Sequence, residues 1–538
     1  MNAEKVDPKV FDPGNPAYRW ILWKRINSST GGYYFFFWRK VCLVAGAALL
    51  AIWLAATAGI WANAKYRRGY TEVRYVDLVA PWQWGRYRAT VGARYLGLGR
   101  AELDAGNPYS AFYNFKGALA MMPDSIESRR LAGLAQARIG MKAEALSLLQ
   151  AGLSAAARAG DEAYLQLYFD TAFDLQADDE ARTAGQALLP SPPDGLKIHR
   201  LIALEVATSL YNRSHYADAE QLLSDWRLLD QPDGDILFAR CQAGQGSRAG
   251  AIRRLSADLD RFPQRDGILA ALEELARDQG LFQDVRRYAL LRKQNSPSLP
   301  QPRLDLLRAD QTLGLVPEVQ ADIDSYCSDF KSSAEALKGL GRFAADVGKP
   351  EIAQRILDLA RAAAFPLTDF EVSLAQASLI NRDYPRVFQT ITMAQAGGQS
   401  PSPSSAAFLA GIKATALLGD NDYGADTAFA EFLANSRALR PDAGLVLVAQ
   451  LLREGFPAQS RRLLEKLCSD NPGDKEALAE LVRAEAALAD HAGLAASLPR
   501  LLKMRKPPRD ALNAALPWLD PGTDAPLRAA VVYALTNG

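Results

Sequence analysis

The sequence is poor in the residues that usually carry metal or redox chemistry. Of its 538 residues, only 4 are cysteine and 3 are histidine. The histidines, His199, His215 and His491, are far apart, and no HExxH motif, paired-cysteine zinc spacing, Gly-rich phosphate loop or nucleophile elbow occurs. Cys42 lies in an apolar run and the other three cysteines are widely spread, so no disulfide framework is predicted. We therefore expect no catalytic residues, no metal and no cofactor, and a protein that is not an enzyme.

The chain also lacks an excess of either charge. It has 62 Lys and Arg against 61 Asp and Glu, a formal net charge of +1. Proteins that bind nucleic acid normally show a basic stripe, so a nucleic-acid partner is not expected. Long runs of alternating polar and apolar residues are scarce too, whereas alanine and leucine are abundant. This composition predicts an almost entirely helical protein.

What the sequence does contain is a repeat with a long, fixed period. Gly99 and Gly133 are 34 positions apart, and each is followed twelve positions later by an alanine, Ala111 or Ala145. The first unit is completed by Phe115, Ala118 and Pro123. A fixed period of this length is typical of stacked helix-turn-helix units, each of which covers the apolar face of its neighbour.

A second run keeps the same period over four steps. Its small or β-branched residues are Ala251, Val285, Val319, Ala353 and Val387. Pro263 and Pro297 each fall twelve positions after such a residue, and Gly341 falls twelve positions before Ala353. Proline there is expected to end the second helix of a unit, because it cannot continue the hydrogen-bond ladder.

These residues resemble the signature of the tetratricopeptide repeat (TPR) family. Tyr95 stands where that family has tryptophan, and Glu102 where it has tyrosine. The resemblance covers roughly residues 91–505 and implies an all-α solenoid of helix-turn-helix repeats. It also implies a concave surface that binds a peptide or a helix of a protein partner.

The repeat predicts a division of the chain. We expect a first solenoid block at 91–396, a possible hinge loop at 397–407 in a Gly/Ser/Pro-rich stretch, a second block at 408–505 and a C-terminal cap at 506–538. The period slips near 160–215 and after 395, so the exact repeat boundaries stay open there.

Residues 41–62 contain no charge and are long enough to cross a hydrocarbon core of about 30 Å. Basic residues flank this run: Arg39 and Lys40 before it, and Lys65, Arg67 and Arg68 after it. A cleaved signal peptide is the alternative, but its apolar core would be shorter and nearer the N-terminus. We therefore predict a single transmembrane helix between an aromatic and basic tail (1–40) and a juxtamembrane stalk (63–90).

The orientation of the span is not decided by charge. The twenty residues on either side carry four basic residues each, so the positive-inside count is a tie. By analogy with lone N-terminal anchors that precede a large domain, we expect an inner or plasma membrane with the solenoid outside the cytoplasm. Beyond the span, Trp82 and Trp84 are predicted to cap the open end of the solenoid, since terminal repeats need cover.

A basic cluster lies near the end of the repeats. Its members are Arg500, Lys503, Arg505, Lys506 and Arg509. One interpretation is a patch for an anion or an acidic partner. The favoured interpretation is the solvated face of a last helix before Pro507 and Pro508.

The leading functional hypothesis is a membrane-tethered TPR-like scaffold that binds protein partners. A plausible setting is the assembly of a cell-envelope complex for secretion, pilus formation or polysaccharide export. The alternatives are a structural spacer without a specific ligand and the regulatory arm of an enzyme complex. The sequence does not identify the partner or the oligomeric state.

Overall fold

A computed structural model describes residues 22–28, 31–262, 265–396 and 401–537. Most of the N-terminal tail, Pro263 and the first four residues of the expected hinge loop therefore lie outside the described residues. The chain forms two compact units, Met1–Thr171 and Ala172–Gly538, and each is treated by itself.

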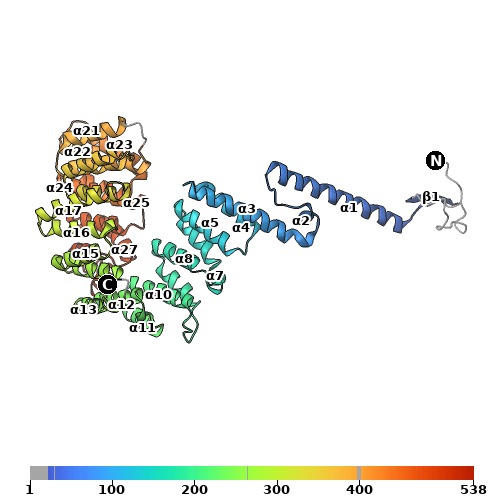
Figure 1. The fold of residues 1–538 in the computed structure, drawn as a ribbon, viewed down its shortest axis with the longest axis horizontal. Helices are drawn as coiled ribbons and strands as arrows, with labels where there is room; N and C mark the ends of the chain where they lie inside the picture. Colours follow the sequence, from blue (N-terminus) through green and yellow to red (C-terminus); the bar gives the residue numbers. More distant parts are fainter. Residues whose placement is uncertain (1–21, 29–30, 263–264, 397–400, 538) are drawn as a thin grey trace. The chain divides into compact units, whose positions relative to one another are not determined.

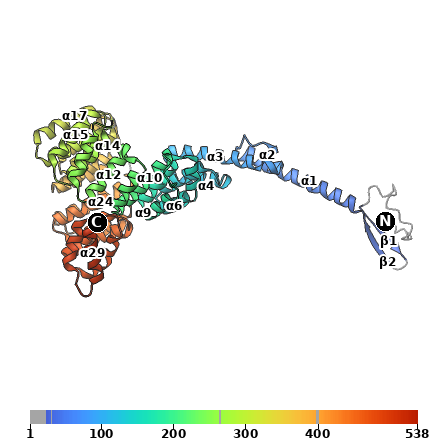
Figure 2. The same ribbon diagram turned by 90° about the horizontal axis from the view of Figure 1, so that it is seen from below.

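The first unit begins with a hairpin and continues as helices (Figure 1). Strands β1 (Trp23–Ser28) and β2 (Gly31–Phe36) pair antiparallel, with Trp23 opposite Phe36 (Figure 2). The helical elements that follow are α1 (Trp38–Ala62), η2 (Asn63–Arg67), α2 (Tyr75–Val79), η3 (Pro81–Gln83), α3 (Trp84–Asp104), α4 (Pro108–Met121), α5 (Ile126–Arg138), α6 (Lys142–Gln150), α7 (Leu153–Ala159) and α8 (Glu162–Asp174), whose last residues belong to the second unit.

The second unit is helical throughout its described residues. Its elements are α9 (Asp178–Gln186), α10 (Lys197–Asn212), α11 (Tyr216–Asp225), η4 (Leu228–Asp230), α12 (Pro232–Gly244), α13 (Arg248–Asp258), α14 (Asp266–Arg277), α15 (Phe282–Asn295), α16 (Pro300–Thr312), α17 (Val316–Asp329), α18 (Ala334–Asp346), α19 (Pro350–Ala362), α20 (Thr368–Ile380), α21 (Tyr384–Ala396), α22 (Pro403–Gly419), α23 (Ala425–Asn435), η5 (Ser436–Ala438), α24 (Pro441–Arg453), α25 (Pro457–Asp470), α26 (Lys475–Ala487), α27 (His491–Leu502), α28 (Arg509–Ala515), η6 (Leu516–Trp518) and α29 (Ala525–Asn537).

The helices pair into repeats through tight turns that carry the same period as the packing residues. The turns after α12, α14, α16 and α18 each contain a glycine with a left-handed backbone, and these glycines are evenly spaced along the chain: Gly246, Gly280, Gly314 and Gly348. Glycine adopts this conformation without the steric cost that a Cβ would bring. The fold class predicted from the sequence, an all-α TPR-like solenoid, is therefore the one observed, and the N-terminal hairpin is an addition to it.

The slip of the period near 160–215 has a structural origin. The left-handed turn residues in and after this region, Gln176, Ser214 and Gly246, are unevenly spaced. The short helix α7 is inserted between α6 and α8, and it ends at the left-handed Gly160. Extra residues within a repeat shift every later position, which explains why the sequence signal fades here.

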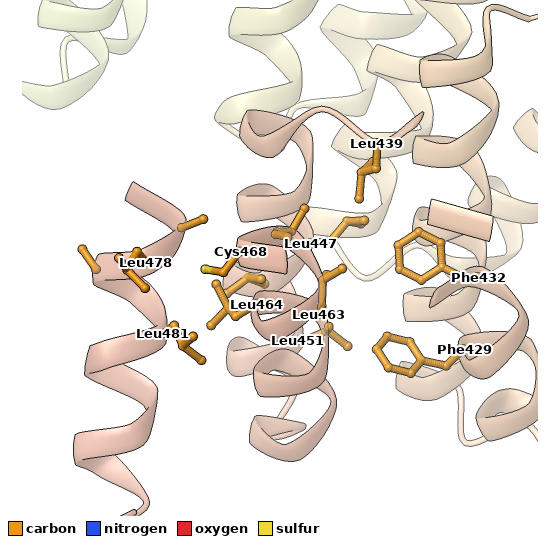
Figure 3. Close-up of a cluster of buried hydrophobic side chains, with 14 of the residues drawn as sticks. Phe429, Phe432, Leu439, Leu447, Leu451, Leu463, Leu464, Cys468, Leu478 and Leu481 are labelled. Carbon is orange, nitrogen blue, oxygen red and sulfur yellow. The ribbon is translucent and has the colours of Figure 1, made fainter. Parts of the chain in front are cut away.

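The core is a row of apolar clusters between neighbouring helices. In the most C-terminal of these clusters, Phe429 and Phe432 of α23 face Leu447 and Leu451 of α24 (Figure 3). Leu463 and neighbouring leucines of α25 continue the cluster toward α26 (Figure 3). Each helix pair in this cluster thus packs against the next pair, as in other solenoids.

The predicted stalk (63–90) is largely helical. It contains η2, α2 and the first turns of α3, and it folds back along α1 (Figure 1). The prediction that Trp82 caps the solenoid is wrong, because this side chain is 84% exposed. Trp84 instead stacks on Trp53 of α1, with ring centroids 5.9 Å apart.

Candidate functional site

The small residues of the first two repeats lie where helices cross closely. Gly99 of α3 is buried, and a Cβ there would overlap the ring of Phe115 on α4. Gly133 of α5 lies against Leu149 of α6, where a Cβ would come within 2.8 Å of Leu149 Cδ2. Fully buried alanines fill the facing positions: Ala111, Ala118 and Ala145.

The signature positions of the second unit are also interior. Ala251, Val285 and Ala353 are buried, and Gly341 packs against Ser373 of α20, where a Cβ on the glycine would lie 3.3 Å from Ser373 Oγ. The turn prolines Pro123 and Pro297 are exposed between helices, and Pro263 lies outside the described residues. These residues therefore lie in the helix packing and in the turns.

The basic residues that flank the apolar helix sit beside aromatic rings. Lys40 Nζ lies 4.5 Å from the ring centroid of Phe37, and Lys65 Nζ lies 5.0 Å from that of Trp61. Arg39, Arg67 and Arg68 are exposed. The helical segment Trp38–Arg67 is long and apolar enough to cross a membrane, with only 6% of its most apolar window buried. A lysine therefore lies beside an aromatic ring at each end of this segment.

A hollow of about 420 Å³ opens beside the first repeat helix, and we call it the α3 hollow. It is lined by Tyr70, Thr71, Glu72, Val73, Thr90, Ala93, Arg94, Gly97 and Leu98. The Arg94 guanidinium lies 5.5 Å from the ring centroid of Tyr70, whose hydroxyl donates to Tyr95 Oη at 3.1 Å. Leu98 is 44% exposed, so the hollow offers an apolar wall together with one cation and one carboxylate.

The second unit closes on itself through residues that are far apart in the chain. Gln176 Nε2 donates to the Gly473 carbonyl at 3.3 Å, and Arg213 Nη1 donates to the Lys503 carbonyl at 3.4 Å. The backbone N–H of Arg505 donates to Gln176 Oε1 at 3.2 Å. We call these contacts, between residues 173–216 and 473–506, the closure contact.

Asp178 is the centre of the closure contact. Its carboxylate is fully buried and accepts from Arg505 Nε at 2.5 Å and from Asn212 Nδ2 at 2.9 Å. Arg213 Nε lies 3.5 Å from Asp178 Oδ2. The Arg505 guanidinium also lies 5.4 Å from the ring centroid of Phe173. Two guanidinium groups and one amide thus compensate the buried Asp178 carboxylate. Removing those partners would leave an uncompensated buried charge and would destabilise the unit.

Lys506 extends the closure contact into an aromatic site. Its Nζ lies 3.0 Å from the ring centroid of Tyr211 and 5.3 Å from that of Tyr216. Burial lowers the pKa of Lys506 to about 7, because the charged amine loses solvation, and the nearby Arg240 and Lys475 lower the pKa further. The amine therefore changes its protonation state close to neutral pH.

These findings correct the favoured interpretation of the basic cluster for two of its five members; Arg500, Lys503 and Arg509 are exposed, as that interpretation expects. Arg505 and Lys506 are half-buried in the closure contact and do not form a solvated face. Beside them is a hollow of about 570 Å³, lined from Asn212 to His215 on one side and by residues of 502–534 on the other. The cluster was visible in the sequence, but its partners lie 290 to 329 positions away. No local pattern indicates such a pairing.

The three histidines lie in or beside three different helices, and each lies near a partner of its own. His199 Nδ1 lies 2.8 Å from Asp194, His491 Nδ1 lies 3.0 Å from the Trp518 carbonyl, and His215 is 3.9 Å from Asp218. Within the described ranges, no group of three or more His, Cys, Asp or Glu side chains is placed to hold a metal ion. Burial raises the pKa of Cys241 to about 12 and that of Cys468 to about 11, so neither thiol is activated.

No protein-family model matches this chain, and neither does any curated protein. Among solved structures, it is similar to the structure of Naa15/Naa10 bound to HypK-THB, at 14% identity, a TM-score of 0.29 and coverage of 90% of this chain and 75% of that one. It is also similar to the Cut9-Hcn1 hetero-tetramer of APC/C, at 12% identity, a TM-score of 0.26 and coverage of 84% and 95%. A tetratricopeptide repeat protein from Parabacteroides merdae ATCC 43184 matches at 12% identity, a TM-score of 0.28 and coverage of 46% and 96%. At these TM-scores the likenesses add nothing to the fold that the helix pairs themselves display.

Proposed function

We propose that this protein is a membrane-tethered scaffold whose TPR-like repeats hold a protein partner, and that α1 is the tether. The observation that carries the proposal is the α3 hollow, which lies on the first repeat helix, directly after the apolar helix and its fold-back segment. A peptide or helix with an apolar side chain and an acidic group would fit its combination of Leu98 and Arg94.

The first repeat also exposes aromatic side chains outside this hollow. Tyr109 and Tyr113 of α4 are 65% and 68% exposed and lie four residues apart, on one face of the helix. Exposed aromatic side chains are frequent anchors in protein interfaces, because they bury a large area at low cost in conformational entropy. They support a partner that engages the first repeat as well as the α3 hollow.

Cell-envelope assembly is the setting we favour, with the solenoid outside the cytoplasm. A reporter that works only outside the cytoplasm, fused after Gly538, is expected to be active. Activity from a cytoplasmic reporter alone would reverse the orientation and would remove this setting, while leaving the scaffold function untouched.

The scaffold function itself is tested by photo-crosslinking in intact cells. A photoreactive amino acid replaces Leu98 in the α3 hollow, and the matched control carries it at Tyr423, a fully exposed position on a turn of the second unit. We expect a reproducible crosslinked protein, identified by mass spectrometry, from position 98 and not from position 423. Equal or absent crosslinking at both positions would overturn the proposal in favour of a spacer without a ligand.

A further inference from the structure

The segment after α1 runs back along it and is held by side-chain hydrogen bonds. Trp61 Nε1 donates to the Val73 carbonyl at 3.1 Å. Tyr75 Oη donates to the Leu54 carbonyl at 2.9 Å, and Trp53 Nε1 donates to the Val79 carbonyl at 3.1 Å. Residues 73–79 are therefore antiparallel to α1 and fixed to it, from the level of Trp61 back to the level of Trp53.

The turn between α2 and α3 is the part of this segment that reaches furthest back. We call residues Val79–Trp84 the tryptophan tip. After it, α3 returns toward the solenoid, where Val91 joins the same buried cluster as Ala64 and Tyr70. Trp82 is 84% exposed, Trp84 is 41% exposed, and Val76 just before the tip is 55% exposed. The tip thus presents large apolar side chains away from the protein.

Backbone carbonyls near the tip accept hydrogen bonds from side chains of the same unit. The carbonyls of Leu78 and Val79 come at the end of α2, where a helix has no internal partner for them. They accept from the indole N–H groups of Trp84, at 2.9 Å, and Trp53, at 3.1 Å. The one carboxylate of α2, Asp77, is buried: Oδ2 accepts a backbone N–H at the start of its own helix, at 3.0 Å, whereas Oδ1 lies 3.8 Å from Arg86 Nε and has no hydrogen bond within the described residues. Internal satisfaction of the two carbonyls is what a segment needs where water is scarce.

The depth of the tip follows from the rise of α1. Trp53 is nine residues before Ala62, which is about 14 Å at 1.5 Å per residue. If the hydrocarbon core covered residues 41–62, the tip would lie near its middle, and the exposed Arg86 and Arg88 would lie within it. Exposed arginines at that depth are strongly unfavourable. The membrane boundary must therefore lie closer to the tip itself.

We propose that the tryptophan tip lies in the headgroup region of the bilayer that α1 crosses, so that the membrane boundary on the solenoid side is at Trp53. This inference rests on the proposed role of α1 as a membrane anchor. Trp82 and Trp84 then occupy the depth that tryptophan favours, and the exposed Arg88, about one turn further on, faces the lipid phosphates, while Arg86 lies 3.8 Å from the buried Asp77 carboxylate. The first repeat and its α3 hollow are thereby held against the membrane surface.

The part of α1 that is left to cross the core is Trp38–Trp53. Its 16 residues span about 24 Å, but Arg39 and Lys40 lie at its far end, so the charge-free residues 41–53 span about 20 Å, roughly 10 Å less than a core of about 30 Å. Local thinning of the bilayer, together with Arg39 and Lys40 reaching toward the headgroups, accommodates this mismatch. Most apolar side chains in this part are exposed around the helix, among them Leu43, Leu49 and Ile52 at 74%, 69% and 64%.

Cysteine accessibility in the full-length protein, reconstituted into lipid vesicles, tests the boundary. In a Cys42→Ser background, one added cysteine at a time replaces Leu49, Ile60 or Trp82, and Tyr423→Cys is the water-exposed control. The three native cysteines that remain, Cys241, Cys327 and Cys468, are buried. All four positions are exposed in the protein, at 69%, 52%, 84% and 107%, so the substitutions leave the packing intact. The probe is a membrane-impermeant maleimide, which reacts only with a hydrated thiolate.

We expect Leu49→Cys to be protected and Ile60→Cys to react about tenfold faster or more, because position 60 lies outside the headgroups. Trp82→Cys is expected to be slower than Tyr423→Cys in vesicles, and a polarity-sensitive dye on it should be quenched by lipids that carry a nitroxide near the headgroup. If Ile60→Cys is as protected as Leu49→Cys, or if Trp82→Cys matches Tyr423→Cys and its dye is unquenched, the inference is wrong. Rapid labelling of Leu49→Cys would instead refute the anchor, and so the proposed function.

Discussion

The regular repeats and the closure contact hold the second unit together in different ways. Between Gly246 and Arg382, buried apolar side chains come from neighbouring helices, and the turns recur at an even interval. At the closure contact, residues from distant parts of the chain meet through Asp178, Arg505 and two tyrosine rings. Stacking is thus distributed over many contacts, whereas closure depends on a few charged groups. The two should respond differently to single substitutions.

The largest effect is expected inside the regular repeats. Phe370 of α20 is 1% exposed and belongs to the cluster between α16 and α20. Phe370→Ala is expected to destabilise the unit by about 4 kcal/mol, because it removes a buried ring and leaves a cavity. Urea unfolding followed by circular dichroism measures this loss. Hydrogen exchange should rise in α18–α21 and stay low at the closure contact, since repeats are stabilised by their neighbours.

Tyr423→Ala is the matched control, because this aromatic side chain is fully exposed. It should change stability by less than about 0.5 kcal/mol. A rise in exchange across the whole unit in Phe370→Ala would contradict the comparison, since it would mean that the repeats and the closure contact unfold as one.

A somewhat smaller effect is expected at the closure contact. Arg505→Met removes a cation from the buried Asp178 carboxylate and should cost about 3 kcal/mol, mostly as the penalty of a less compensated buried charge. Hydrogen exchange should increase at residues 176–178 and 503–507 while α14–α20 remain protected. Arg437→Met, at an exposed arginine, is the control and should change neither.

A double substitution sharpens this prediction. Asp178→Asn combined with Arg505→Met should recover part of the stability lost in Arg505→Met alone. The double variant has no buried carboxylate, and the side-chain oxygen of Asn at position 178 can still accept the hydrogen bond from Asn212. Strictly additive losses would show that the ion pair contributes nothing beyond packing.

The smallest effect concerns Lys506 and depends on pH. Its pKa in the folded chain, about 7, lies below the ordinary 10.5, so the unfolded chain binds this proton more tightly. Between these values stability rises with pH, because unfolding takes up a proton. Lys506→Met has no such cost and should melt about 2 °C higher than the parent at pH 6, with the difference shrinking toward pH 10.

Thermal melts at pH 6, 8 and 10 measure this dependence. Lys413→Met, at an exposed lysine of α22, should show no trend with pH relative to the parent. A constant difference between Lys506→Met and the parent across this range would show that the amine stays charged over the tyrosine rings.

The 34-residue period could be detected in the sequence because stacking constrains residues on neighbouring helices, which are close in sequence. Gly99 must be small because Phe115 of the next helix occupies the space of a Cβ, and that requirement recurs with every helix pair. The turn glycines, from Gly246 to Gly348, carry the same period and would have strengthened the prediction. The hairpin before α1 was missed, since a short aromatic and basic run near an apolar helix has no clear alternation.

The candidate sites were far less predictable. The α3 hollow forms where the segment at Tyr70–Val73 meets α3, and the sequence gives no sign that a predicted stalk folds back along α1. Trp82 was expected to be a cap and is exposed. In both places the decisive contacts come from hydrogen bonds between tryptophan or tyrosine side chains and backbone carbonyls, which leave no periodic trace.

The sequence alone determined the helical class, the repeating helix-turn-helix unit and the apolar helix near the N-terminus, because each follows from spacing or from an unbroken apolar run. Only the tertiary structure decided that Arg505 and Lys506 close the second unit and that the tryptophan tip returns along α1. The closure contact depends on where the accumulated turns of many helices bring residues that are 290 to 329 positions apart, so a small shift within any repeat would move its partners. The fold-back of the tip depends on hydrogen bonds from tryptophan and tyrosine side chains to backbone carbonyls 12 to 26 positions away, and these contacts leave no periodic pattern in the sequence.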